Sequence, residues 1–147
     1  MSRISKSHLF DAKAFLCWQA FDDLSVQLVP IRATVAYHYP PQNNRHSIIL
    51  FYPEFQQDYS EPLFLLFHEA GHILQWKQLE KSGRIETGKR IMNLSKGRER
   101  VLFEEQAWTL GRELFMRFLD QDNLPRDELL KGYAEYQKSC VNSYKDE

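Results

Sequence analysis

The chain carries one short motif whose residue types and spacing suit metal chemistry, His68-Glu69-Ala70-Gly71-His72. Residues four apart lie on one face of an α-helix, so both imidazoles can reach a single ion. Glu69 lies about 100° round the helix from His68 and about 60° from His72, beside that ion rather than on it. Two imidazoles on zinc and a carboxylate next to a metal-bound water are what a zinc hydrolase requires. The motif therefore predicts His68 and His72 as zinc ligands and Glu69 as the general base.

The residues before the motif indicate that it lies on a buried helix. Five consecutive apolar residues, Leu63–Phe67, precede it, so this helix is apolar on every side. Two histidines and a glutamate are costly to bury without a partner, which a metal ion would supply. Two other interpretations stay open. One is a polar network in the core that is satisfied without a metal, and the other is a scaffold that binds zinc without catalysing a reaction.

A catalytic zinc site has three protein ligands and one open position, so a third ligand must come from elsewhere in the chain. No third histidine follows the motif within the same predicted helix. The other histidines, His8, His38 and His46, all precede the motif, and we expect them to be ordinary surface or strand residues. Glu104 and Glu105, on a helix further along the chain, are the better candidates.

The periodicity of that later helix favours Glu104 over Glu105. Residues three and four positions from Glu104 form an almost wholly apolar stripe, whereas the flank around Glu105 is mixed and includes Arg112. Glu104 is therefore predicted to point into the core, where it would be costly without a cation. Ala107 and Gly111 follow on the same stripe, and their small size would let this helix approach the motif helix closely. The alternative is that Glu104 is the buried partner of an arginine or a backbone amide.

The remaining pattern predicts an α+β fold, in which a small sheet or hairpin packs on a mainly helical domain around the central motif helix. Spacings of three and four residues mark helices, alternation marks strands, and proline, glycine and asparagine mark turns. We expect Trp18 to lie in the core with the other aromatic residues of helical spacing. The predicted elements are a helix over 7–22 capped by Ser7, strands over 26–39 and 47–52 joined as a hairpin, a loop over 53–59, the motif helix from Ser60 to before Gly83, a helix over 98–119, and a last helix that carries residues 129–140.

The segment 82–97 is predicted to be a mobile connection, because it holds three of the six glycines. From Lys77 to Arg100 the chain has eight Lys and Arg residues against three Glu residues. Such a charge run could be a lid, or a docking surface for an acidic partner or a nucleic acid. A solvated loop is the more ordinary interpretation and is favoured here.

Length and composition fit a single domain over residues 1–147. The net charge of −1 excludes a nucleic-acid binder that acts through bulk charge. No apolar run approaches the roughly 20 residues that cross a bilayer, and Asp11 and Lys13 interrupt what would be a secretory leader. Cys17 and Cys140 match no metal-binding or redox spacing and are expected to be reduced core thiols. These features predict a cytoplasmic protein without membrane or nucleic-acid partners.

The residues around the motif resemble those of a known family. Leu66–His72, followed on a later helix by Glu104-x-x-Ala107, are similar to the ImmA/IrrE-type gluzincin metallopeptidases. The resemblance covers residues 47 to about 119 and includes an apolar strand before the motif helix. It implies a zincin-like metallopeptidase domain and a compact cytoplasmic α+β protease. Some members of the family cleave repressors and thereby switch on mobile-element transfer or stress genes.

The resemblance implies His68, His72 and Glu104 as the zinc ligands and Glu69 as the base. Trp108 departs from the family pattern, because Asn or Asp is common at that position and is the usual partner of a ligand imidazole. No helix-turn-helix unit accompanies the domain, so a regulatory partner would be a separate chain.

Together these residues predict a zinc-dependent endopeptidase that acts on a protein or peptide substrate, with a transcriptional repressor as one candidate. Binding to Zn²⁺ lowers the pKa of a water towards about 7, and Glu69 would take its proton and pass it to the leaving amine. The ion and a Tyr, His or Arg side chain would stabilise the oxyanion. An extended substrate could pair with Ile48–Tyr52 if that strand lies at the edge of the sheet. The alternative is a catalytically silent zincin-fold regulator that binds a partner protein.

Overall fold

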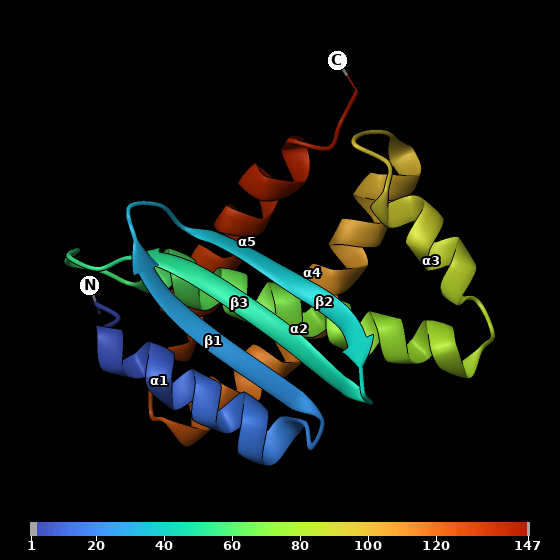
Figure 1. Cartoon of the computed structure of the whole chain (residues 1–147). Helices are drawn as coiled ribbons and strands as arrows, with labels where there is room; N and C mark the ends of the chain where they lie inside the picture. Colours follow the sequence, from blue (N-terminus) through green and yellow to red (C-terminus); the bar gives the residue numbers. More distant parts are fainter. Residues whose placement is uncertain (1–2, 147) are drawn as a thin grey trace.

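The computed structural model describes residues 3–146. A helix comes first, a three-stranded sheet follows, and four helices complete the chain (Figure 1). The α+β fold predicted from the sequence is confirmed. Among the helices of these residues, none combines the length and the hydropathy needed to cross a membrane. The elements are α1 (Lys6–Phe15), β1 (Leu24–Ile31), β2 (Val35–Gln42), β3 (Arg45–Pro53), α2 (Ser60–Lys81), α3 (Ile85–Met92), α4 (Arg98–Gln121) and α5 (Arg126–Asn142).

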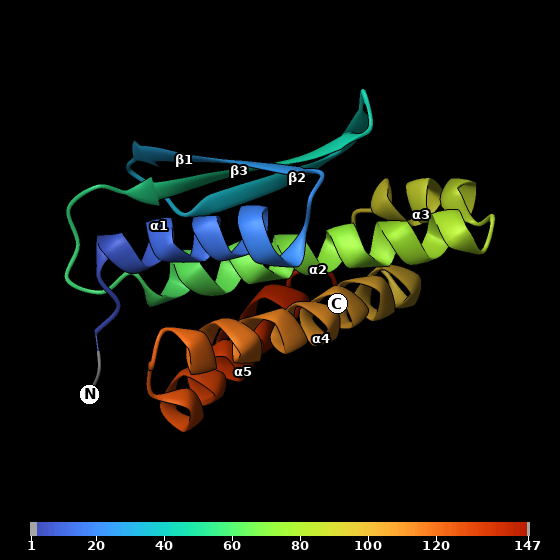
Figure 2. The same ribbon diagram turned by 90° about the horizontal axis from the view of Figure 1, so that it is seen from below.

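Helix α2 lies at the centre of three layers (Figure 2). The sheet covers one side of α2 through β2 and β3, with α1 beside α2 under the same sheet, and α4 and α5 pack on the opposite side. A helix enclosed on both sides must be apolar all round, and Leu63–Phe67 meet this requirement. Nearly every residue from Pro62 to Ile73 is buried. The predicted central, buried motif helix is therefore confirmed.

The sheet has the strand order β1-β3-β2, with β1 parallel and β2 antiparallel to β3. The predicted hairpin is present as β2 and β3. Asn43 and Asn44 turn between them with φ of 54° and 63°, the positive values that a tight two-residue hairpin turn requires. Because β3 is the central strand, Ile48–Tyr52 does not lie at an edge, and substrate pairing with this segment is excluded. The edge strands are β1 and β2.

The single strand expected over 26–39 is wrong, because this region forms two strands on opposite sides of β3. Residues 32–34 bend and carry the chain across the end of β3 (Figure 1). The alternation of apolar residues continues through the bend, so the period of two does not reveal it. Pro30, which has no N–H to donate, lies near the end of β1, where an edge strand tolerates it.

The first helix differs from the prediction at both ends. Ser5 rather than Ser7 caps it, and the Ser5 amide donates to Nδ1 of His8 at 2.9 Å. At the other end the chain makes a π-helical turn over Leu16–Ala20. This wider turn changes the direction in which side chains point. Trp18 is 86% exposed and does not lie in the core.

Half of the connection predicted over 82–97 is helical, since α3 occupies its middle. Gly83 and Gly97 flank α3 with φ of 69° and 113°, backbone conformations that favour glycine. The glycines therefore mark turns on either side of a helix rather than a long loop. The Arg100 guanidinium donates to the Leu94 carbonyl at 2.9 Å and fastens the end of this segment to α4.

Helices α2 and α4 approach so closely that their backbones touch. A Cβ atom on Gly71 would overlap the carbonyl oxygen of Ala107, and one on Gly111 would overlap the carbonyl oxygen of Phe67. The close approach that the small residues of α4 predicted is confirmed. It places Glu104 one turn before the contact and directly opposite the motif.

We expect Gly71→Ala and Gly111→Ala each to lower the free energy of unfolding by about 1–3 kcal/mol or more, since a methyl group would push two backbones apart. At an exposed helix position the same change stabilises by about 1 kcal/mol, so the sign of the effect is diagnostic. Gly88→Ala in α3 is the matched control, because a Cβ there meets only the flexible end of the Leu79 side chain. Chemical denaturation measures all three variants, and a Gly71→Ala protein as stable as the wild type would contradict the close approach.

Candidate metal centre

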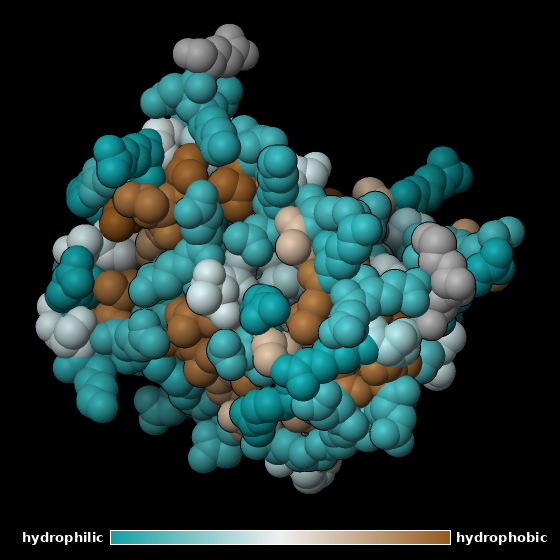
Figure 3. Space-filling view, turned by 180° about the vertical axis from the view of Figure 1, so that it is seen from behind, coloured by the Kyte–Doolittle hydropathy of each residue, from teal (hydrophilic) through white to brown (hydrophobic). Residues whose placement is uncertain are grey.

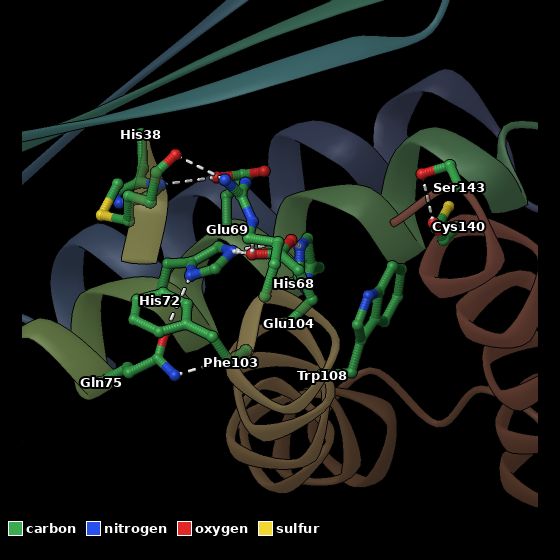
Figure 4. A network of polar contacts seen from close by, with 12 residues as sticks. His38, His68, Glu69, His72, Gln75, Phe103, Glu104, Trp108, Cys140 and Ser143 are labelled. Carbon is green, nitrogen blue, oxygen red and sulfur yellow. Dashed lines mark hydrogen bonds and ion pairs between the residues drawn. The ribbon is translucent and has the colours of Figure 1, made fainter. Parts of the chain in front are cut away.

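Three titratable side chains of α2, His68, Glu69 and His72, are buried in the middle of the helix, between β2 and α4 (Figure 4). Glu104 reaches the two histidines from α4 and is only 2% exposed. His68 Nε2 lies 3.2 Å from Glu104 Oε1, and His72 Nε2 lies 3.1 Å from Glu104 Oε2. Ligand atoms of these three residues all lie within 4.8 Å of one another, so the group could hold a metal ion. The structure thus brings the predicted ligand residues together.

Of the two glutamates considered, only Glu104 enters this cluster. Glu105 is partly buried on another flank of α4 and lines a separate cavity beside α5. The stripe predicted around Glu104 is buried, as Ala107, Gly111 and Phe115 show. The rotation of α4 deduced from its periodicity is therefore correct.

Burial and the close carboxylate set the protonation of the cluster. Burial by itself would raise the pKa of Glu104, but hydrogen bonds with His68 and His72 outweigh it and hold that pKa well below its ordinary value. Burial lowers the pKa of His68, and the neighbouring His72 adds to the shift. Burial also acts to lower the pKa of His72, but Glu104 outweighs it, so this pKa lies above its ordinary value. The result is an ionised carboxylate facing two imidazole nitrogens.

One carboxylate oxygen of the cluster lacks a hydrogen-bond donor, and a metal ion could occupy the place of that donor. Glu104 Oε2 is buried and accepts no hydrogen bond with good geometry. The arginine partner considered from the sequence is present only in part, because Arg100 Nε lies 3.4 Å from this oxygen and donates no hydrogen bond. A buried carboxylate oxygen without a donor is costly, and a cation between it and the two Nε2 atoms would compensate. Two imidazoles and one carboxylate form the ligand set of an open catalytic site.

Glu69 lies beside this cluster, in the position that the helical geometry predicts. Its Oε2 lies 2.9 Å from Nδ1 of His38, which reaches it from β2 (Figure 4). The His38 ring also stacks on His72, with 4.7 Å between the ring centroids. Burial raises the pKa of Glu69, but the hydrogen bond with His38 and the nearby imidazoles outweigh it, so the pKa is lowered. The carboxylate is therefore ionised and able to accept a proton.

His38 is a site residue that the sequence analysis missed, and the expectation that it is an ordinary strand residue is wrong. Along β2, Tyr37 and Tyr39 are about half exposed on the outer face, whereas His38 points towards α2. Alternation along β2 places His38 on the face opposite Tyr37 and Tyr39, but alternation alone does not say which face is buried. His8 and His46 lie outside the site, as expected, because one belongs to the start of α1 and the other is buried at the start of β3.

The two imidazoles of the motif have different surroundings. His72 Nδ1 lies 2.9 Å from Gln75 Oε1, and Gln75 Nε2 donates to the carbonyl of Phe103 at 2.9 Å. His68 Nδ1 is buried without a hydrogen-bond partner, and its ring stacks on Trp108 with 4.1 Å between the centroids. Trp108 therefore packs against His68 and supplies no polar partner to its Nδ1. Gln75 was missed, although its place three residues after His72 on one helix was a usable signal.

A cavity of about 570 Å³ opens beside the cluster. Residues 34–38, mostly from β2, form one wall, and Tyr136 and Tyr144 line it from α5 and the segment after it. The Arg100 guanidinium also lines the cavity and lies 4.6 Å from the centre of the Tyr144 ring. Cys140 lines the same cavity as a free, half-buried thiol whose pKa is raised by burial. The buried metal-binding group therefore has a route to solvent.

A second cavity, of about 700 Å³, lies between α2, α3 and α4. Leu79, Ile91 and Leu102 give it an apolar lining. Apolar side chains also gather around the beginning of α4 on the face behind the sheet (Figure 3). Gln75 and Phe103 line this cavity from the side of His72. Within residues 3–146 a second group, His38, Glu69 and His72, could also hold a metal ion. Both this group and that of His68, His72 and Glu104 line the first cavity, so the second cavity is not the metal centre.

No family model, curated protein or solved structure matches this chain. The main observation that bears on function is therefore the buried group of His68, His72 and Glu104 with Glu69 beside it. This arrangement can hold a divalent metal ion, keep a carboxylate ionised next to it and admit a small group from the cavity.

We expect Glu104→Ala to remove a bound divalent metal ion, and Glu105→Ala to leave the metal content unchanged. The two residues are neighbours of the same type on one helix, so Glu105 is a matched control, and only Glu104 faces both imidazoles. His72→Ala should also lose the metal and destabilise the domain, because metal binding is coupled to folding. Elemental analysis and thermal unfolding measure both effects. Loss of the metal in Glu105→Ala alone would mean that α4 is rotated by about 100° from this arrangement.

Proposed function

We propose that the chain is a zinc-dependent endopeptidase with a zincin-like domain, similar to the ImmA/IrrE-type gluzincins. The observation that carries the proposal is the buried group of His68, His72 and Glu104, beside an ionised Glu69 and open to a cavity. Two imidazoles and one carboxylate suit Zn²⁺, and three protein ligands leave the fourth position for the reaction. The motif on α2 and its resemblance to the family support the same conclusion.

In this proposal the residues of the chain divide the work of peptide hydrolysis. Zinc, when bound, supplies a Lewis acid that lowers the pKa of water and polarises the scissile carbonyl. Glu69 accepts the proton of the attacking water and delivers it to the leaving amine. His38 holds the Glu69 carboxylate through its Oε2, which leaves the other oxygen free to face the water. Apart from the proposed zinc ligands, the His, Arg and Tyr side chains that line the cavity are the candidates for stabilising the oxyanion: Tyr37, His38, Arg100, Tyr136 and Tyr144.

The strand that would bind an extended substrate is β2 rather than β3. In the described part of the chain β2 pairs only with β3, so its other edge has unpaired backbone groups. Residues 34–38 of this edge line the cavity next to Glu69. An extended peptide added along β2 would pass the metal centre. The proposed substrate is a protein segment, such as part of a transcriptional repressor encoded as a separate chain, and the proposed location is the cytoplasm.

Glu69→Gln is expected to keep one zinc ion per chain and the wild-type fold while turnover falls by about 10²–10⁴-fold, because only the general base is lost. The measurement is cleavage of a candidate repressor, followed by mass spectrometry, together with elemental analysis of both proteins. A variant that cleaves the repressor normally would show that another residue is the base. If the repressor is bound and inactivated equally by both proteins without cleavage, the chain is instead a non-enzymatic regulator.

His38→Ala is expected to keep the zinc and reduce kcat by about 10–100-fold, because the Glu69 carboxylate loses the hydrogen bond that orients it. Tyr39→Ala, one residue further on the same strand but on the outer face, is the control and should leave kcat unchanged. Steady-state kinetics on a peptide from the cleaved segment separate kcat from KM. Equal losses in both variants would indicate damage to β2 as a whole rather than a role for His38.

A further inference from the structure

A chain of hydrogen bonds connects α4 to the rear of His72 through Gln75 (Figure 4). The carbonyl oxygen of Phe103 can only accept, so the Gln75 atom at 2.9 Å from it must be the donating Nε2. The second N–H of the same amide donates to Gln106 Oε1 at 2.6 Å. These two bonds fix the orientation of the Gln75 side chain, which is itself 2% exposed.

The fixed amide determines which nitrogen of His72 carries a proton. With Nε2 of Gln75 committed to α4, Oε1 is the atom that faces His72 Nδ1 at 2.9 Å. An amide oxygen can only accept, so Nδ1 must carry a hydrogen. The other ring nitrogen, Nε2, faces Glu104 in the metal-binding group. A metal ion can therefore bind at Nε2 only, while Nδ1 of His72 keeps its proton and donates it to Gln75 Oε1.

The ring of His72 is also held by packing. Phe103 stacks on it at 5.6 Å and His38 at 4.7 Å between ring centroids. His68 is also packed, against Trp108, but its Nδ1 is buried without a hydrogen-bond partner. The two ligand imidazoles thus differ, and only His72 has a polar partner that defines both its proton and its orientation.

We propose that Gln75 is a positioning residue that presents Nε2 of His72 to the metal ion. The inference rests on the proposed metal site and concerns His72 alone, because Trp108 packs on His68 and offers no polar partner to it. An amide is required here because the side chain must accept from His72 and donate to Phe103 at the same time. A carboxylate could accept from His72 but would place an oxygen without a proton against the Phe103 carbonyl.

The zinc affinities of two Gln75 variants distinguish a role in positioning His72 from a role in the stability of the fold alone. Gln75→Met keeps the length of the side chain but cannot accept from His72, so zinc affinity should fall by about 10–100-fold. Gln75→Glu keeps the acceptor and loses the bonds to α4, so it should be less stable than the wild type but bind zinc at least as tightly. Gln78→Met, the same change one turn further at an exposed position of α2, is the control and should bind zinc normally. Competition with a chromogenic chelator gives the affinities and chemical denaturation the stabilities.

The proton on His72 gives a second, independent measurement. In the zinc-loaded wild-type protein, NMR should detect a slowly exchanging Nδ1–H on His72, and this signal should be lost in Gln75→Met. Loss of zinc affinity in parallel with stability in both Gln75 variants would overturn the inference, and so would a Gln75→Met protein that keeps both the signal and the affinity. In those cases the metal site itself stands. A wild-type protein that binds no zinc at all would instead refute the proposed function.

Discussion

The contact between the backbones of α2 and α4 is the constraint on which the site depends. Gly71 and Gly111 allow it, because a side chain at either position would overlap a carbonyl oxygen of the other helix. Gly71 lies between the two histidines of the motif, so the faces that carry His68 and His72 are brought against α4 at the same point. Glu104 then reaches both Nε2 atoms without leaving its own helix. A side chain at either glycine would push the helices apart and move the Glu104 carboxylate away from both Nε2 atoms.

This contact also buries the negative charge of Glu104, which the surrounding residues compensate only in part. Glu104 is ionised and buried, one of its oxygens accepts no hydrogen bond, and Arg100 balances its charge only from 3.4 Å. Isolated buried charges are strongly unfavourable, so natural cores pair them or use them to bind cations. The two imidazoles can balance the carboxylate only when protonated, which burial opposes at His68. A divalent ion would satisfy all three groups together, and its binding energy would then also stabilise the contact between the helices.

The features that the sequence predicts correctly are those that depend on residue spacing within one helix. The spacing of the motif and the apolar stripe around Glu104 are local, so the sequence predicts both which faces meet and how closely. His38 was missed because its importance depends on which face of β2 covers α2, and alternation alone defines two faces without saying which is buried. The bend at 32–34 was missed for a related reason, since the alternation passes through it unbroken. Trp18 was misplaced because a π-helical turn, which the residue pattern does not reveal, alters the direction of its side chain.

Strand β2 joins the two halves of the site, because it performs two tasks with the same backbone. Its inward face carries His38, which holds the Glu69 carboxylate, and its free edge is the place where an extended peptide could pair. Since side chains alternate along a strand while its backbone groups form the edge, a peptide paired along β2 would run beside the strand that carries His38. A peptide paired along residues 34–38 would therefore pass Glu69, the proposed base. The hairpin partner β3 keeps β2 in place through its own pairing and, as the central strand, leaves only the outer edge open.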